Sequence, residues 1–326
     1  MFHFTFDPPE RLINANGMEK QLTDTILMIE PVAFGFNEDT AQNNFFQQKD
    51  CTPENIIQQK ALSEFSAMVR QLRDKDIQVI VVKDTIVPHT PDSIFPNNWI
   101  SFHQSGNVVV YPMFAKNRRL ERRSDIIQTV ADTGFKIAGI IDYSDYENCN
   151  CFLEGTGSMV LDRTNRIAYA ALSERTDKAL FERFCNETNY RAVSFIANQT
   201  VDQLRLPVYH TNVVLCVAEE FVVICFDCID NPDEINVLRT NFANTGKEII
   251  SITEKQMHSF AGNMLQVMNR EGKKFLVMSQ AAFDVLELSQ IESLRKYNEF
   301  IVVAVPTIEK YGGGSVRCMM AEVFYK

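Results

Sequence analysis

The sequence predicts an α/β fold, a five-bladed α/β-propeller of strand, strand, helix, strand repeats. Three observations support this prediction. The repeat recurs about every 50 residues, its last copy lacks the helix and the closing strand, and the N-terminal part of the chain carries a helix and strands outside the repeats. Repeats of this length are typical of closed or stacked repeat architectures. We expect a single domain over residues 1–326, with residues 1–24 as an N-terminal extension.

The N-terminal elements are two apolar strands and one helix. Residues 25–31 form an apolar run that ends at a proline, and a polar loop follows over residues 37–50. Residues 53–74 place apolar side chains at helical spacing, and residues 77–82 form a second apolar run. These elements supply what the fifth repeat lacks.

Four complete repeats follow, and the helix in each repeat separates the fold from an all-β propeller. The expected elements are 98–102, 108–114, 120–131 and 135–141; 152–161, 166–171, 177–189 and 191–196; 208–217, 221–226, 232–241 and 248–252; and 263–268, 274–278, 281–296 and 300–305. The fifth repeat is a single strand at 315–325.

Composition excludes several classes of partner. The net charge of −10 and the pI near 5.1 argue against nucleic acid and anionic membranes, which require a basic face. We find no apolar run of signal-peptide or membrane-span length. The eight cysteines are sparse and irregularly spaced, so we expect reduced thiols and a cytoplasmic protein. Neither cysteine pair, 149 and 151 or 225 and 228, has a nearby histidine, so we expect no metal and no other cofactor.

A glycine-rich loop near the C-terminus ends in a cysteine. The stretch is Gly312-Gly313-Gly314-Ser315-Val316-Arg317-Cys318. Glycines allow a sharp turn and a close backbone approach to a ligand. Cys318, beside an arginine, is a candidate nucleophile, although a lone cysteine is more often a packing residue.

The start of each repeat carries a polar or nucleophilic residue. These residues are Asn98, Glu154, His210, Asn263 and Cys318, at spacings of 56, 56, 53 and 55. Each has an ordinary structural reading as a turn residue, a strand end or a packing residue. In a ring, however, the five positions are equivalent and face one axis. A cysteine, a histidine and a carboxylate at equivalent positions indicate a catalytic site.

The chain resembles the superfamily of guanidine-modifying enzymes, which comprises arginine deiminases, dimethylarginine dimethylaminohydrolases and amidinotransferases. The resemblance spans essentially the whole chain and is similar in detail to the bacterial citrulline-utilisation hydrolases. Its marks are Pro91-Asp92-x-x-Phe95-x-x-Asn98, Glu154-Gly155, Leu172-Ser173-x-Arg175-Thr176, His210-x-Asn212, the Cys318 loop, Pro31-Val32-x-Phe34-x-Phe36-Asn37 and Asn43-Asn44.

The resemblance implies roles for the three central residues. Cys318 would attack the carbon of a guanidinium or ureido group and form a covalent intermediate. His210 would protonate the leaving amine and then activate water. Glu154 would orient the substrate nitrogens and favour protonated His210.

The resemblance also implies a substrate-binding set. Arg175 and Arg118 occupy the places that bind the α-carboxylate of an amino acid, and Asp92 can pair with a cation. Asn98 and Asn212 stand where arginine deiminases carry aspartates, and neutral amides suit a neutral ureido group better than a guanidinium. Three further residues complete the expected set: Phe95, Asn263 and Ser315.

The leading hypothesis is a cysteine hydrolase that cleaves a C–N bond of a free amino acid, with citrulline favoured over arginine and methylarginines. The alternatives are an amidinotransferase, which uses the same intermediate, and a non-catalytic amino-acid-binding protein. The expected partner is a small-molecule substrate. A monomer and a homodimer are both compatible with the sequence.

Overall fold

The computed structural model describes residues 19–324. The first 18 residues of the predicted extension lie outside this range, but its last residues pack against the domain. Gln21 is buried, and its side-chain amide donates hydrogen bonds to the carbonyl groups of Leu161 (3.0 Å) and Val217 (3.3 Å). Residues 19–24 therefore lie against two different sheets.

Five three-stranded sheets form the framework, and they share one topology. In each, the middle strand pairs antiparallel with the first strand named here and parallel with the last. The sheets are β17 (Ala321–Glu322), β1 (Thr25–Glu30) and β2 (Gln78–Lys83); β3 (Ile100–Phe102), β4 (Asn107–Val110) and β5 (Gly139–Asp142); β6 (Val160–Asp162), β7 (Ile167–Ala171) and β8 (Arg191–Phe195); β11 (Leu215–Val217), β12 (Phe221–Ile224) and β13 (Glu248–Ser251); and β14 (Leu265–Met268), β15 (Lys274–Ser279) and β16 (Glu299–Val303).

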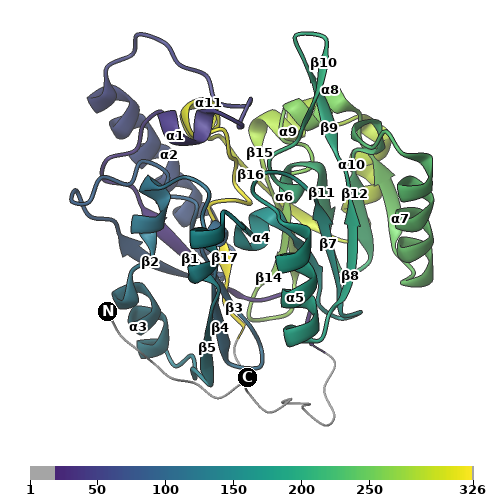
Figure 1. The fold of residues 1–326 in the computed structure, drawn as a ribbon, viewed down its shortest axis with the longest axis horizontal. Coiled ribbons are helices and arrows are strands. Elements are labelled where there is room, and N and C mark those ends of the chain that lie inside the picture. Colours follow the sequence, from purple (N-terminus) through teal and green to yellow (C-terminus); the bar gives the residue numbers. More distant parts are fainter. Residues whose placement is uncertain (1–18, 325–326) are drawn as a thin grey trace.

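Segments from both ends of the chain share the first of these sheets (Figure 1). Ile26 of β1 faces Glu322 of β17 on one side and Val79 of β2 on the other. This pairing confirms that the N-terminal segment completes the fifth repeat. It also fixes the loop before β17, which carries Cys318, against the rest of the molecule.

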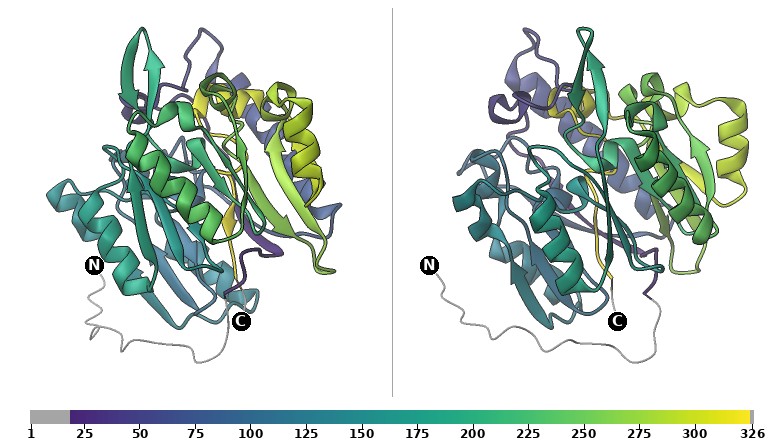
Figure 2. Two further views of the ribbon diagram at one scale, coloured as in Figure 1. Left: turned by 90° about the vertical axis from the view of Figure 1, so that its right-hand side faces the viewer. Right: turned by 45° about the vertical axis from the view of Figure 1, so that its right-hand side comes forward.

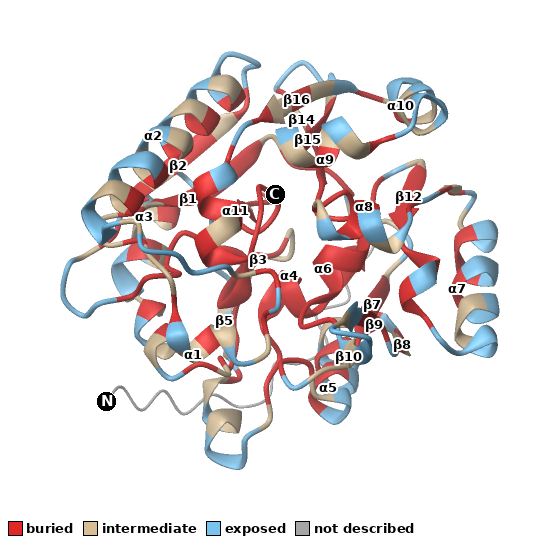
Figure 3. Cartoon of the chain, turned by 90° about the horizontal axis from the view of Figure 1, so that it is seen from above, coloured by how far each residue is buried: buried red, intermediate tan, exposed pale blue. Residues whose placement is uncertain are grey.

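Amphipathic helices cover the sheets from outside, with their exposed faces turned away from the centre (Figure 3). The longest is α2 (Glu54–Arg73), which buries Ile57, Ala61, Phe65, Met68 and Leu72 at the three- and four-residue spacing of a helix face. The others are α3 (Ser124–Asp132), α5 (Lys178–Thr188), α7 (Pro232–Asn244), α9 (Gln280–Val285) and α10 (Leu288–Arg295). The single helix predicted over 281–296 is wrong, because the chain leaves the helical conformation at Leu286.

The predicted first strands of the repeats start too early. Short helical turns precede the strands: η1 (Pro96–Asn98), α4 (Gly155–Ser158) and α6 (Thr211–Val214). Gly155 has φ +47° and begins α4, which breaks the apolar run predicted as strand 152–161. The candidate residues Asn98, Glu154 and His210 therefore lie in or directly before a turn rather than within a strand.

Several elements were not predicted. They are α1 (Glu38–Ala41), α8 (Glu254–His258), α11 (Pro306–Gly312), the turns η2 (Asn117–Glu121), η3 (Ser144–Cys149) and η4 (Phe226–Cys228), and the hairpin of β9 (Asn198–Val201) and β10 (Leu204–Pro207). The hairpin projects from the body of the molecule (Figure 2). Its two turn residues, Asp202 and Gln203, have positive φ although neither is glycine, so composition gave no turn signal.

The sheets are small, and within residues 19–324 no strand pairs across two of the three-stranded sheets. They pack edge to edge instead, with β3 beside β17 and β6 beside β11. The predicted α/β class is confirmed.

No helix among the described residues has the length and apolar character needed to span a membrane.

Candidate active site

The turns that precede the first strands gather near the centre of the molecule. The α4 turn packs against both η1 and α6. This approach is close because Gly155 has no side chain: a Cβ there would lie 2.3 Å from the carbonyl oxygen of Asn97 in η1. Side chains from different sheets therefore meet in one place.

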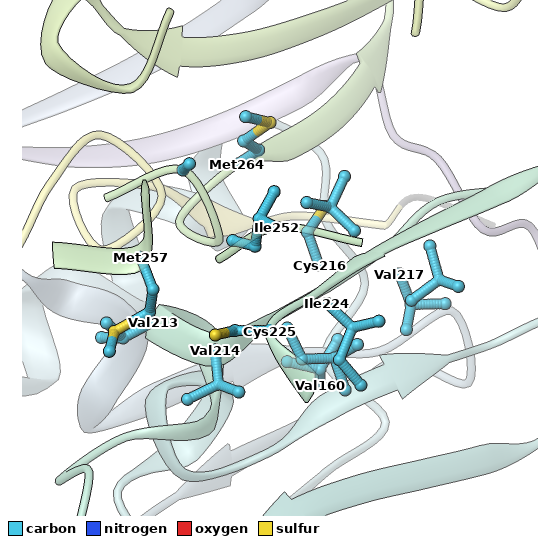
Figure 4. Close-up of a cluster of buried hydrophobic side chains, with 14 of the residues drawn as sticks. Val160, Val213, Val214, Cys216, Val217, Ile224, Cys225, Ile252, Met257 and Met264 are labelled. Atoms are coloured by element: carbon cyan, nitrogen blue, oxygen red, sulfur yellow. The ribbon is translucent and has the colours of Figure 1, made fainter. Parts of the chain in front are cut away.

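The α6 turn is anchored from behind by an apolar cluster. Val213 and Val214 are fully buried in it, together with Cys225 and Met257 (Figure 4). Because the apolar residues of the turn face this cluster, its polar neighbours His210 and Asn212 are left for the site.

Cys318 lies in the turn after the glycine loop and is only 2% exposed. Two side-chain amides donate to its sulfur, from Asn212 Nδ2 at 3.3 Å and from Asn263 Nδ2 at 3.4 Å. Asn263 is itself held, since its Oδ1 accepts from the backbone N–H of Arg317 at 3.1 Å. Two N–H donors are therefore directed at one sulfur, where they hold the Cys318 side chain in place.

His210 and Glu154 form a buried pair. His210 Nε2 lies 2.8 Å from Glu154 Oε2, and the other carboxylate oxygen accepts from the backbone N–H of Phe114 at 2.9 Å. Burial by itself would raise the pKa of Glu154, but the charge of Arg175 and the hydrogen bond from His210 outweigh it and lower this pKa to about 2. Glu154 is therefore ionised at neutral pH and fixes the orientation of the imidazole.

Glu154 favours the protonated form of His210, as expected, but burial and the nearby arginine charges have the larger effect on this pKa. Burial lowers the pKa of His210 to about 4, and the charges of Arg175 and Arg118 act in the same direction. The hydrogen bond and charge of Glu154 raise this pKa but do not compensate. The imidazole is therefore neutral at pH 7 and can accept a proton.

Gly157 of α4 leaves the space that His210 occupies. A Cβ at this position would lie 2.8 Å from both Nδ1 and Cε1 of His210, and 2.4 Å from Asn98 Nδ2. A Cβ atom essentially never approaches non-bonded atoms this closely, so only glycine allows the imidazole and the Asn98 amide to stand side by side.

Arg118 is buried, and its guanidinium is committed to protein partners. Nε and Nη2 pair with the two oxygens of Glu121 at 2.8 and 2.9 Å, and Nη1 donates to Asn98 Oδ1 at 2.8 Å. Nη2 also donates to the backbone carbonyl groups of Asp92 and Phe95. Arg118 therefore binds the oxygen of the Asn98 amide, while the amide nitrogen has no partner among residues 19–324.

Arg175 is equally buried, but its guanidinium is held by the N-terminal segment. Nε and Nη2 both donate to Asn43 Oδ1, at 2.8 and 2.5 Å, and Nη2 also donates to the carbonyl of Thr40 at 2.9 Å. Nη1 lies 3.6 Å from Glu154 Oε2. Arg175 thus links the catalytic carboxylate to residues 40–43.

Three buried polar atoms of the site have no hydrogen-bond partner among residues 19–324: Asp92 Oδ1, Asn98 Nδ2 and Asn212 Oδ1. Burial raises the pKa of Asp92 in spite of nearby Arg118, while its Oδ2 accepts from Asn37 and Thr40. Buried polar atoms are costly when unpaired. Two acceptors and one donor are therefore available to a ligand.

A small pocket connects these groups. The predicted residues Asp92, Phe95, Asn98, Arg118, Arg175, His210 and Cys318 line it. Asn212 and Asn263 lie beside it through their contacts with Cys318. Ser315, predicted to bind substrate, instead donates to buried Glu309 at 2.6 Å. The remaining lining residues, which sequence reasoning did not assign to the site, are Thr40, Asn44, Tyr209, Gly312 and Gly314.

The residues missed by sequence reasoning come from three parts of the chain: the segment 37–50, the position before His210 and the glycine loop. Thr40 and Asn44 lie in the polar segment 37–50, which looked like an ordinary loop, although its asparagine content was a usable signal. Tyr209 precedes His210 and donates to the carbonyl of Gly313, which holds the glycine loop in place.

Residues 19–324 contain no group of three or more His, Cys, Asp or Glu side chains arranged to hold a metal ion.

The fold and the site define a class: an α/β enzyme with a buried cysteine, a histidine–glutamate pair and buried arginines around one pocket. The family model for eukaryotic N,N dimethylarginine dimethylhydrolase matches residues 30–325. The chain therefore belongs to this family, within the superfamily of arginine deiminases, dimethylarginine dimethylaminohydrolases and amidinotransferases. This family is named for a hydrolase that acts on N,N dimethylarginine. No curated protein matches the sequence.

Solved structures show the same fold at low sequence identity. ArgZ, an arginine dihydrolase of the ornithine–ammonia cycle in cyanobacteria, superposes with a TM-score of 0.69 at 17% identity over 93% of this chain. The match covers 41% of ArgZ, so this chain corresponds to less than half of that protein. The N-terminal domain of ArgZ, in a serine-for-cysteine variant bound to substrate, gives 0.67 at 16% identity, with 92% of this chain and 98% of that chain covered.

A dimethylarginine dimethylaminohydrolase bearing an adduct with 4-chloro-2-hydroxymethylpyridine is also similar. Its TM-score is 0.62 at 15% identity, with 92% of this chain and 99% of that chain covered. Identities this low establish the shared fold. They leave the substrate to be inferred from the residues of this site.

Proposed function

We propose that this protein is a cysteine hydrolase that cleaves a C–N bond in the ureido or guanidino group of a free amino acid, with citrulline as the favoured substrate. The observation that carries the proposal is the placement of Cys318 and the His210–Glu154 pair around one pocket whose unpaired polar atoms match a ureido group.

The first step is attack of the Cys318 sulfur on the central carbon of the substrate. Neutral His210 accepts the thiol proton, which becomes favourable as charge develops on the substrate. The two asparagine amides that contact the sulfur hold it in position for the attack. His210 then gives the proton to the leaving nitrogen, and for citrulline ornithine departs while the carbamoyl group stays on sulfur.

The second step is hydrolysis of the intermediate. His210, neutral again, removes a proton from water, and the resulting hydroxide attacks the carbon attached to sulfur. The thiolate leaves and the proton returns to it. The product released from sulfur is carbamic acid, whose C–N bond then breaks to give carbon dioxide and ammonia. The net reaction adds one water to citrulline and gives ornithine, carbon dioxide and ammonia. Glu154 remains ionised and keeps Nε2 of the imidazole oriented.

The preference for a ureido group follows from the three unpaired atoms. Asn98 Nδ2 is a donor, because Arg118 binds the oxygen of the same amide. A ureido carbonyl can accept from it, whereas a guanidinium carries only donors. Asp92 Oδ1 and Asn212 Oδ1 are acceptors for the ureido N–H groups. One donor and one acceptor that line the pocket, with a second acceptor on Asn212 beside it, therefore match citrulline better than arginine or a methylated arginine.

A substrate panel tests the proposal. Purified protein is incubated with citrulline, arginine, dimethylarginine and agmatine, and released ornithine, amines and ammonia are measured. We expect ornithine and ammonia from citrulline, with a higher kcat/KM than for the other compounds, and no turnover by Cys318→Ala. Equal turnover by Cys318→Ala would contradict the mechanism. Product that appears only when an acceptor amine such as glycine is added would assign amidino transfer instead.

We further propose that the five sheets close into one ring around the pocket, as in a five-bladed α/β-propeller. The common topology of the sheets and the arrangement of the turns at the centre support this. All eight cysteines are unpaired, which supports action in a reducing compartment such as the cytoplasm.

A further inference from the structure

The guanidinium of Arg175 is the one large cationic group of the pocket whose partners come from the N-terminal segment. Its side chain is 2% exposed, and the rings of Phe114 and Tyr209 flank it. The two nitrogens Nε and Nη2 form the fork that binds a carboxylate side-on. In this structure both nitrogens donate to a single neutral oxygen, Asn43 Oδ1.

Asn43 is held in this orientation by its other end. Its Nδ2 donates to Glu174 Oε2 at 2.9 Å, which directs the amide oxygen toward Arg175. Glu174 is exposed and Asn43 is half-buried, so this amide returns to water at little cost when it leaves Arg175. Asn43 therefore accepts the hydrogen bonds of Arg175 in this structure, and a ligand can displace it because the released amide is solvated by water.

The neighbouring residues close the pocket through the same segment. Thr40 and Asn37 donate to Asp92 Oδ2, and Asn44 Nδ2 donates to the carbonyl of Gly313 at 3.2 Å. With these contacts made, Cys318 is 2% exposed and the pocket is narrow. A substrate therefore has to displace part of residues 37–44 before it reaches the cysteine.

We propose that Asn43 occupies the place of the substrate carboxylate on Arg175 and so determines selectivity for amino acids over their decarboxylated analogues. This inference rests on the proposed function. An amino-acid substrate exchanges the Asn43 amide for its own carboxylate, whose charge-assisted hydrogen bonds are roughly twice as strong as neutral ones. An analogue without a carboxylate must leave Asn43 in place, or leave Nε of the buried guanidinium without an acceptor while Nη2 keeps only the carbonyl of Thr40.

The electrostatics of the site agree with this exchange. Burial lowers the pKa of His210, and the charge of Arg175 lowers it further. The neutral amide of Asn43 does nothing to balance that charge, whereas a bound carboxylate does. Carboxylate binding would therefore bring His210 closer to the protonated form that it needs as the general acid.

Two substitutions at position 43 and one control test the proposal by steady-state kinetics with citrulline and with carbamoylputrescine, its decarboxylated analogue. Asn43→Ala removes the competitor, so we expect the KM for citrulline to fall roughly three- to tenfold, with no change for the analogue. Asn43→Asp places a carboxylate on Arg175, so we expect the KM for citrulline to rise at least about tenfold. Gln42→Asp adds the same charge one residue away, on an exposed position, and should change neither KM.

The result that would overturn the proposal is a higher KM for citrulline in Asn43→Ala, or an equal factor of change for both compounds. Binding measured by calorimetry in the Cys318→Ala background distinguishes failure of the Asn43 proposal from failure of the proposed function. If no substrate is turned over but citrulline binds more tightly when Asn43 is replaced by alanine, the reaction assignment fails and the role of Asn43 stands. If turnover is found and the affinity for citrulline does not depend on Asn43, the reaction assignment stands and the proposed role of Asn43 fails.

Discussion

Replacement of Gly157 by alanine tests the geometry of the site through a single methyl group. The new Cβ would lie 2.4 Å from Asn98 Nδ2 and 2.8 Å from Nδ1 and Cε1 of His210. Ordinary contacts between such atoms are about 3.5 Å, so these neighbours must move by roughly 1 Å. Neither moves freely, because His210 is held by Glu154 at 2.8 Å and Asn98 by Arg118 at 2.8 Å.

The expected consequence is large for catalysis and moderate for stability. A misplacement of about 1 Å in a catalytic group lowers the rate by roughly 100-fold, so we expect kcat with citrulline to fall by about that factor. Overpacking of a buried site costs about 1–3 kcal/mol of unfolding free energy. The two effects are separated by measuring kcat at saturating substrate and the free energy of unfolding in urea.

Gly35→Ala is the matched control. A Cβ at Gly35 would meet no atom within 4 Å, so this substitution should change neither quantity appreciably. The reasoning is refuted if Gly157→Ala keeps the wild-type kcat while folding normally, because His210 would then tolerate a contact that the structure forbids.

Three further predictions concern the charges of the site. Glu154→Gln keeps the shape of the side chain but removes its charge, so we expect kcat to fall by roughly 100-fold or more, measured at saturating citrulline. Asn98→Asp replaces a donor by an acceptor, so the ratio of kcat/KM for arginine to that for citrulline should rise at least about tenfold. The contribution of His210 to the free energy of unfolding should fall by about 3 kcal/mol as the pH drops from 6.5 to 4, because the unfolded chain binds a proton at His210 with the ordinary pKa of 6.5 while the folded protein binds it only near 4. Buried Glu121, whose pKa is raised to about 7, acts in the opposite direction, so this contribution is measured as the difference between urea titrations of the wild-type protein and of His210→Asn. The same pH profile for both proteins would contradict the lowered pKa.

The repeat pattern predicted the site because position within a repeat is a topological property. Asn98, Glu154, His210, Asn263 and Cys318 each precede the first strand of a three-stranded sheet. The five sheets share one topology, so their turns lie at equivalent places. The polar residues at those starts could therefore be assigned to a common site from spacing alone.

Other features depend on contacts that spacing does not encode. Asn43 meets Arg175 across 132 residues of chain, and the polar segment around Asn43 carries no periodic signal. Ser315 lies in the glycine loop, but it turns to Glu309 because that buried carboxylate needs a donor. The protonation state of His210 depends on burial and on charges contributed by separate elements. Each of these results required the three-dimensional arrangement.

The central claim is that Cys318 forms a covalent bond to the central carbon of the substrate. The most direct measurement is acid quenching of the protein during turnover of citrulline, followed by mass spectrometry of the peptide that contains residue 318. The account predicts a carbamoyl group on Cys318 during turnover, its disappearance once substrate is exhausted, and its absence in Cys318→Ala. Rapid turnover with an unmodified Cys318 at every quench time, or the added mass on another residue, would contradict it.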